Sequence, residues 1–377
     1  VLRLVAARSA IVALDDGISA AWSRPGVATD LAEAAVRDPF SVLSLYVAGG
    51  RELQNYAGDA LVQTDDRLLL EYSAPRTIYG FFQRANVERL RDVERSARQP
   101  QAVARARAEA TPAEWRNRGL MQLRAGAVDL GYADLRNAVM GAPADAEALQ
   151  GLARAAARSG RLEGTERLLS EIGTVPALVE LSFLRAVLGR VDEAIGAARD
   201  AVVRNPTDRS ALVQLASMYA DAGDEDALVR LIELVEQARV DRAVLLYCQM
   251  RLAYLRGDFQ EAAQRGEALA ARDPADVKAH NLLGSAYAAL GRYDRARQAL
   301  EASLQITPTD PGVLVNLGTI ALRANDPVLA SERFSEALFL SPTHSGALDG
   351  LAEAYDKQGN RARAAEVRAR TPKSVIQ

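Results

Sequence analysis

The chain has 377 residues, of which 49% are hydrophobic and 25% are charged, and its formal net charge is −3. This composition excludes general disorder and provides enough apolar surface for a large core. No apolar run approaches the roughly 20 residues of a membrane-spanning helix, so the sequence predicts no span. The near-neutral charge gives no electrostatic reason to expect nucleic acid as a partner.

Residues suited to catalysis or metal binding are few. Cys248 is the only cysteine, and the two histidines are His280 and His344. A single cysteine excludes an internal disulfide framework and a cysteine zinc cluster. We expect Cys248 to be a small buried apolar residue in a helix, His280 to be a packing residue and His344 to lie in a loop. The sequence therefore predicts no catalytic residue, no bound cofactor and no metal site.

The N-terminal segment, residues 1–83, shows mixed strand and helix patterns. Strands are predicted over residues 1–5 and 9–14, with a turn at Asp15-Asp16-Gly17. Helices are predicted over 27–36 and 41–47, and a short strand should end before Pro75. The chain opens without a start methionine, on a strand already under way, so we expect a piece of a longer chain.

A resemblance to a known family lies in the same segment. The resemblance rests on three runs of residues: Ala57-Gly58-Asp59-Ala60, Thr64-Asp65-Asp66-Arg67 and Leu70-Glu71-Tyr72-Ser73-Ala74-Pro75-Arg76. These runs resemble the C-terminal end of bacterial spermidine-synthase-like proteins, in particular those in which that domain follows a membrane-spanning region. The resemblance implies that residues 1–83 are the remnant of an α/β domain. The glycine loop and the catalytic acidic residues of that family belong to earlier strands, so no catalytic residue is carried over.

Asp65 and Asp66, with Glu71 nearby, have two interpretations. They could form an acidic site for a polyamine or a metal. The favoured interpretation is a hairpin turn whose carboxylates accept backbone N–H groups.

The charge-rich residues 84–111 follow, with helices predicted over 86–98 and 102–110 that connect to the next domain and cap it.

Internal repeats dominate the chain from residue 112 onward. Pro274, Pro308 and Pro342 are 34 residues apart, and Pro206 lies two such periods before Pro274. If each proline is position 32, eight repeats begin at residues 112, 146, 175, 209, 243, 277, 311 and 345. The interval from 146 to 175 is only 29 residues, so that repeat should lack residues in its second helix or the following loop.

Each repeat carries the pattern of a helix pair. Apolar residues at positions 4, 7 and 11 form one helical stripe, and small residues at positions 8 and 20 allow close helix approach. Glycine at position 15 should end the first helix in a left-handed turn, at Gly126, Gly160, Gly189, Gly223, Gly257, Gly291 and Gly359. A single pair cannot bury its stripe, so the pairs must stack.

This pattern resembles the tetratricopeptide repeat. The nearest match is Ala279-His280-Asn281-Leu282-Leu283-Gly284-Ser285-Ala286-Tyr287, followed by Gly291-Arg292-Tyr293-Asp294-Arg295-Ala296 and Pro308. The resemblance implies a mainly α fold: a right-handed α-solenoid of eight helix pairs over residues 112–371, preceded by the small α/β remnant and followed by a tail, 372–377.

In such a solenoid the first helix of each pair faces a concave groove. The resemblance places eleven residues there, mostly polar or aromatic: Tyr247, Arg251, Tyr254, Lys278, Asn281, Ser285, Asn316, Thr319, Arg323, Asp349 and Glu353. Such a wall suits an extended peptide, although simple solvation of the groove is equally compatible. Some family members grip a C-terminal carboxylate with a Lys/Asn/Arg set, of which Lys278, Asn316 and Arg323 would form an incomplete version.

Two functions follow from these patterns. The preferred one is a non-catalytic protein-interaction scaffold, attached in the intact protein to a spermidine-synthase-like domain. It would bind a peptide, a partner domain or its own upstream catalytic domain in the groove. The alternative is part of an aminopropyltransferase, with the repeats as a regulatory or oligomerising accessory. We expect a cytoplasmic location, or a membrane-associated one if an upstream region anchors the chain.

Overall fold

The described part of the chain is helical. The computed structural model describes residues 14–33, 36–43, 92, 101–307, 310–342 and 344–370. These residues form 20 helices and no strand. They belong to two compact units, Val1–Met121 and Gln122–Gln377. The strands predicted over 1–5 and before Pro75, and the candidate acidic site, lie outside the described residues. So does the strand predicted over 9–14, except for its last residue, Leu14, which belongs to a helix. The domain boundaries predicted at residues 83 and 111 stay a prediction.

The first unit contains helices α1 (Leu14–Trp22), α2 (Val27–Glu33), α3 (Pro39–Leu43) and α7 (Gln101–Glu109). The turn predicted at residues 15–17 is wrong, because these residues belong to the first turn of α1. Aspartates favour a helix N-terminus as well as a turn, so the pair of aspartates did not distinguish the two. Helix α3 begins at Pro39, two residues earlier than predicted, where the Asp38 carboxylate accepts the Ser41 N–H at 2.7 Å.

An aromatic contact joins α3 to the first repeat helix, α8 (Pro112–Arg124). The rings of Phe40 and Trp115 meet edge to face with centroids 5.2 Å apart, and the Arg118 guanidinium lies 4.8 Å from the Trp115 centroid. Asn117 also donates to the Asp38 carboxylate at 2.8 Å. The segment before the repeats therefore contacts position 4 of the first repeat, which has no preceding repeat to pack on.

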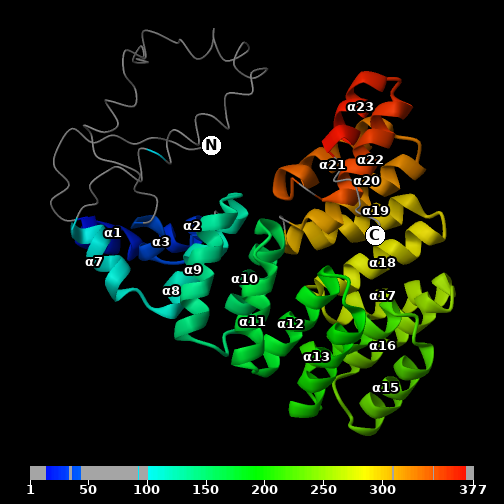
Figure 1. Ribbon diagram of the computed structural model, residues 1–377, viewed down its shortest axis with the longest axis horizontal. Helices are drawn as coiled ribbons and strands as arrows, with labels where there is room; N and C mark the ends of the chain where they lie inside the picture. The colour runs from blue at the N-terminus through cyan, green and yellow to red at the C-terminus, as the bar shows by residue number, and fades with distance from the viewer. Residues whose placement is uncertain are drawn as a thin grey trace. The chain divides into compact units, whose positions relative to one another are not determined.

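Eight helix pairs follow one another in the described residues between 112 and 370. Figure 1 shows the later pairs stacked in chain order along a curve. After α8 the helices are α9 (Val128–Gly141), α10 (Ala146–Ser159), α11 (Leu162–Ile172), α12 (Val175–Val187), α13 (Val191–Arg204), α14 (Arg209–Asp221), α15 (Glu225–Gln237), α16 (Arg242–Leu255), α17 (Phe259–Arg272), α18 (Val277–Ala289), α19 (Tyr293–Ile306), α20 (Pro311–Arg323), α21 (Pro327–Leu340), α22 (Ser345–Lys357) and α23 (Arg361–Arg370). The predicted α-solenoid is confirmed, and first helices begin at the predicted repeat starts except at α16, which begins at 242 rather than 243.

Position 15 of the repeats has the predicted left-handed conformation. All seven glycines there have φ between 71° and 78°. The remaining repeat has Asn325 at this position, with φ of 61°, and asparagine tolerates this conformation better than most residues. The backbone turn is therefore kept where the glycine is absent.

The short repeat has lost residues from both predicted places. Helix α11 has 11 residues where α13 has 14. Two residues, Gly173 and Thr174, connect it to α12, whereas four residues, 205–208, connect α13 to α14. Three helical and two connecting residues account for the shortening from 34 to 29.

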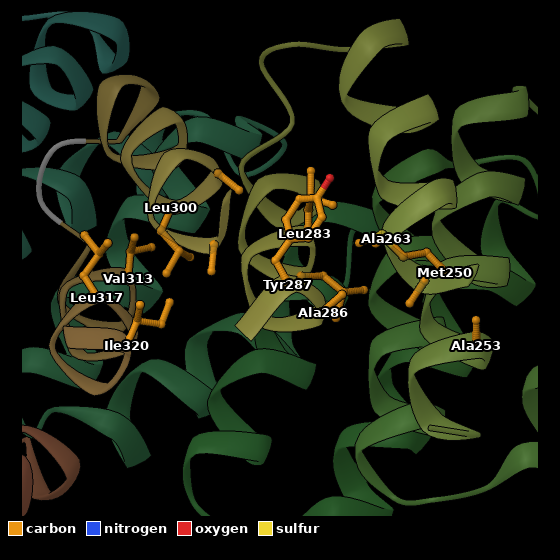
Figure 2. Close-up of a cluster of buried hydrophobic side chains, with 14 residues drawn as sticks. Met250, Ala253, Ala263, Leu283, Ala286, Tyr287, Leu300, Val313, Leu317 and Ile320 are labelled. Carbon is orange, nitrogen blue, oxygen red and sulfur yellow. The ribbon is translucent and has the colours of Figure 1, made fainter. Parts of the chain in front are cut away.

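Each buried cluster of the core extends over several consecutive helices. Figure 2 shows one of these clusters: Met250 and Ala253 of α16, Leu283 and Tyr287 of α18, and further apolar side chains of α19 and α20. Small residues set the spacing, since a Cβ added at Gly284 would lie 2.7 Å from Leu300 Cγ. Each pair therefore completes the core of its neighbours.

Candidate functional site

The first helices of five consecutive pairs, α12, α14, α16, α18 and α20, line a hollow of about 310 Å³. Six of the eleven predicted groove residues meet there: Tyr247, Arg251, Lys278, Asn281, Ser285 and Asn316. Gln214 and Asp221 line it as well. They occupy positions 6 and 13 of the repeat that begins at 209, the positions that Asn316 and Arg323 hold in the repeat that begins at 311, so a rule based on repeat position identifies them.

The other five predicted residues do not line this hollow. Tyr254 packs edge to face on Phe259, with ring centroids 5.2 Å apart, beside the buried core. The Thr319 hydroxyl donates to the Val315 carbonyl at 2.9 Å within its own helix. Glu353 pairs with a lysine one turn along, while Arg323 and Asp349 are exposed farther along the first helices. Their assignment to a groove stays a prediction.

Polar side chains cross-link the wall of the hollow between helices. Gln214, which is 6% exposed, donates to the Ser182 hydroxyl at 3.2 Å and accepts from Lys278 Nζ at 3.2 Å. These bonds connect α12, α14 and α18, although Gln214 and Lys278 are 64 residues apart in sequence. The wall is therefore organised before any ligand binds.

A second set of bonds holds the centre of the wall. The hydroxyl groups of Ser217 and Tyr247 are 2.9 Å apart. Arg251 donates from Nη2 to the Ser217 carbonyl at 3.1 Å and pairs with the Asp221 carboxylate. These contacts, both made by Nη2, hold the guanidinium of Arg251 against the wall and do not involve its Nε.

Two polar atoms of the wall are buried and have no hydrogen-bond partner among the described residues. They are Arg251 Nε, a donor, and Asn281 Oδ1, an acceptor. A buried polar group without a partner costs free energy, and a peptide backbone carries one acceptor and one donor per residue. Both atoms are covered by surrounding protein, so they add a local cost to the fold and are not open to a peptide in this conformation.

Charged and phenolic groups at or near the hollow have shifted pKa values. Lys278 keeps access to water, but the protein that surrounds its side chain lowers the pKa of Lys278, against the opposing effect of Glu180. Burial likewise raises the pKa of Glu180, against the effects of Arg154 and Lys278. Burial also raises the pKa of Tyr247. The interior is therefore less polar than an open surface.

Cys248 and the two histidines have structural roles. Cys248 is fully buried, as predicted, and burial raises the pKa of its thiol to about 12. His280 is partly exposed and its Nε2 lies 3.0 Å from the Pro274 carbonyl oxygen, so it ties down the preceding turn as well as packing. His344 caps α22, because its Nδ1 accepts the Ala347 N–H at 3.3 Å.

The described residues contain no group of three or more His, Cys, Asp or Glu side chains placed to bind a metal ion. Among the same residues, every helix is too short or too polar to cross a bilayer.

Comparison with known proteins gives a family match inside the repeats. A family model described as tetratricopeptide repeat matches residues 249–311. Within the solenoid, residues 249–311 therefore match the tetratricopeptide repeat.

Two curated proteins are similar over part of the chain. Protein CTR9 homolog of Arabidopsis thaliana is 25% identical over 274 residues, which are 68% of this chain and 25% of that protein. Cellulose synthase operon protein C of Xanthomonas axonopodis pv. citri is 38% identical over 71 residues, or 19% of this chain and 5% of that protein. The chain thus spans a quarter or less of the length of these relatives.

Among solved structures, a tetratricopeptide repeat protein from Parabacteroides merdae is 17% identical, with a TM-score of 0.44, and the match covers 64% of this chain and 98% of that one. Pseudomonas aeruginosa pilF is 16% identical, with a TM-score of 0.38, and the match covers 51% of this chain and 88% of that one.

Proposed function

We propose that this chain is a non-catalytic protein-interaction scaffold that binds an extended peptide segment of a partner in the hollow of its inner wall. The observation that carries the proposal is the hollow lined by six of the predicted groove residues, on a wall whose side chains are held by hydrogen bonds between helices. A wall fixed in advance lowers the entropic cost of binding an extended chain.

The charges of the hollow favour a partner segment of mixed charge. Arg251 and Lys278 are cationic, while Asp221 and Glu180 are anionic, and all four lie on or beside the same concavity. A segment with a single sign of charge would meet repulsion from half of these groups.

The test starts from a random-sequence peptide display library selected on the full chain. The best peptide is then titrated by calorimetry against the wild type and against a triple variant of residues that line the hollow, Asn281→Ala, Ser285→Ala and Asn316→Ala. We expect binding to be lost while the melting temperature stays unchanged. A matched triple variant on exposed second-helix positions, Arg230→Ala, Gln237→Ala and Gln264→Ala, should bind like the wild type. Equal binding by both triple variants would exclude the hollow as the binding site.

We also propose that the scaffold is attached to a spermidine-synthase-like domain. The support is the sequence of residues 57–76, which resembles the end of such a domain. The coding sequence upstream of Val1 provides the test, since a glycine-rich nucleotide loop in frame is expected there. This chain alone should show no aminopropyl transfer, and measured turnover would instead favour the alternative in which it carries part of the enzyme.

A further inference from the structure

One arginine joins the beginning of the second unit to its far end. Arg158 lies in the last turn of α10. Its Nε donates to the carbonyl oxygen of Leu340 at 3.0 Å, although the two residues are 182 positions apart. Its Nη1 lies 3.3 Å from the carbonyl oxygen of Leu123. The side chain therefore bridges the second helix pair, the end of α8 and the end of α21.

The guanidinium of Arg158 is partly buried, and its partners are backbone groups. Both acceptors are carbonyl oxygens in the last turns of helices, where the helix dipole favours a cation. In the described part of the chain no carboxylate forms an ion pair with Arg158, and its Nη2 is buried without a partner. Burial lowers the pKa of Arg158. The contact therefore combines two favourable charge–dipole hydrogen bonds with an unfavourable removal of charge from water.

A second contact lies at the same junction. A Cβ built on Gly126 would lie 4.0 Å from Cε1 of Phe339, so the ring is beside the turn between α8 and α9. Phe339 is 70% exposed and precedes Leu340, the acceptor of Arg158. The junction therefore includes an apolar contact that does not depend on the arginine.

We propose that Arg158 is a clasp that holds the end of α21 against the first two helix pairs and closes the solenoid on itself. Replacing Arg158 removes both hydrogen bonds at this junction, so the clasp should then open.

The closure can be measured without any ligand. Spin labels are placed on cysteines at the exposed positions Ala125 and Ser335 of the full chain, after Cys248→Ala removes the native thiol. Double electron–electron resonance then reports the distance between the labels in the wild-type background, in Arg158→Gln and in Arg154→Gln. Arg154 is exposed one turn earlier in the same helix, so it is the matched control.

We expect one short, narrow distance distribution in the wild type and in Arg154→Gln, and a longer, broader one in Arg158→Gln. Circular dichroism should show the same helix content in all three proteins. If the Arg158→Gln protein fails to fold, Phe339→Ser provides a second route to the same junction and should broaden the distribution partly. A wild-type distribution that is already long, or an Arg158→Gln distribution identical to the wild type, would overturn the clasp. Neither result would affect peptide binding by the hollow, which the triple variant tests separately.

Discussion

The packing of Phe334 between two glycines makes a quantitative prediction for Gly350→Ala. Phe334 of α21 is 1% exposed. A Cβ on Gly350 of α22 would lie 2.3 Å from its Cζ atom, and a Cβ on Gly318 of α20 would lie 2.8 Å from the same ring. The ring thus fills the space left by two missing side chains, and it cannot move away from one helix without meeting the other.

Two effects of opposite sign decide the result. Replacing glycine by alanine inside a helix stabilises it by about 1 kcal/mol. Forcing an extra methyl group into a packed core costs about 1–3 kcal/mol, and the separation of 2.3 Å places this site at the upper end. We therefore expect Gly350→Ala to lower the free energy of unfolding by about 1–2 kcal/mol.

Thermal and urea denaturation of the full chain, with amide hydrogen exchange on α20–α22 as the local readout, measure this loss. Gly196→Ala is the control, because Gly196 lies inside α13 with no atom within 4 Å of its added Cβ, and it should stabilise. Combining Gly350→Ala with Phe334→Leu should cost less than the sum of the single changes, since leucine leaves room for the methyl group. If Gly350→Ala were as stable as Gly196→Ala, the packing argument would be refuted.

Three further changes test other parts of the fold. Glu166 is half-buried, and this partial burial raises the pKa of its carboxyl, but hydrogen bonds from Arg190 and Arg185 lower the pKa more, so the net pKa is below the ordinary value. The contribution of Glu166 to stability is therefore present above the unfolded-state pKa and is lost as the pH falls through the folded-state pKa. At pH 7, Glu166→Gln should lower the free energy of unfolding by about 2 kcal/mol. Urea titrations should show this difference vanish in acid. Arg239 has φ of 51°, so Arg239→Gly should raise the free energy of unfolding by about 1 kcal/mol, and a loss of stability would contradict the strain. Cys248 is buried with its thiol pKa raised to about 12, so a disulfide reagent should label it only in denaturant, and rapid labelling of the native protein would contradict its burial.

The repeat pattern predicted the solenoid closely because the residue type at each position is determined by the local conformation or packing there. Glycine at position 15 is required by a left-handed turn, and the structure shows that turn in every repeat where the pattern places it. The aspartates at 15 and 16 gave no such unique answer, since a hairpin turn and a helix N-terminus both accept acidic residues. Local patterns therefore predict a structure reliably only where one conformation alone satisfies them.

The inner wall was predicted less completely, because the positional rule gives the direction of a side chain and not its partners. Tyr254 occupies a groove position, but the neighbouring ring of Phe259 draws it towards the core. The bond between Lys278 and Gln214 joins residues two repeats apart, and its formation depends on how tightly the superhelix winds. A rule derived from one repeat contains no information on that winding.

The winding of the solenoid also decides which groups meet across it. Each helix pair turns by a small angle relative to its neighbour, so an error at one junction accumulates over the following pairs. The contact of Arg158 with Leu340 is sensitive to the sum of all junctions between α10 and α21, including the short repeat that ends at α11. The loss of five residues there changes the rotation at one junction and therefore the position of the far end. Restoring residues to that repeat should then separate Arg158 from Leu340, even though neither residue is altered. The irregular interval in the sequence and the long-range bond of Arg158 in the described residues are therefore connected.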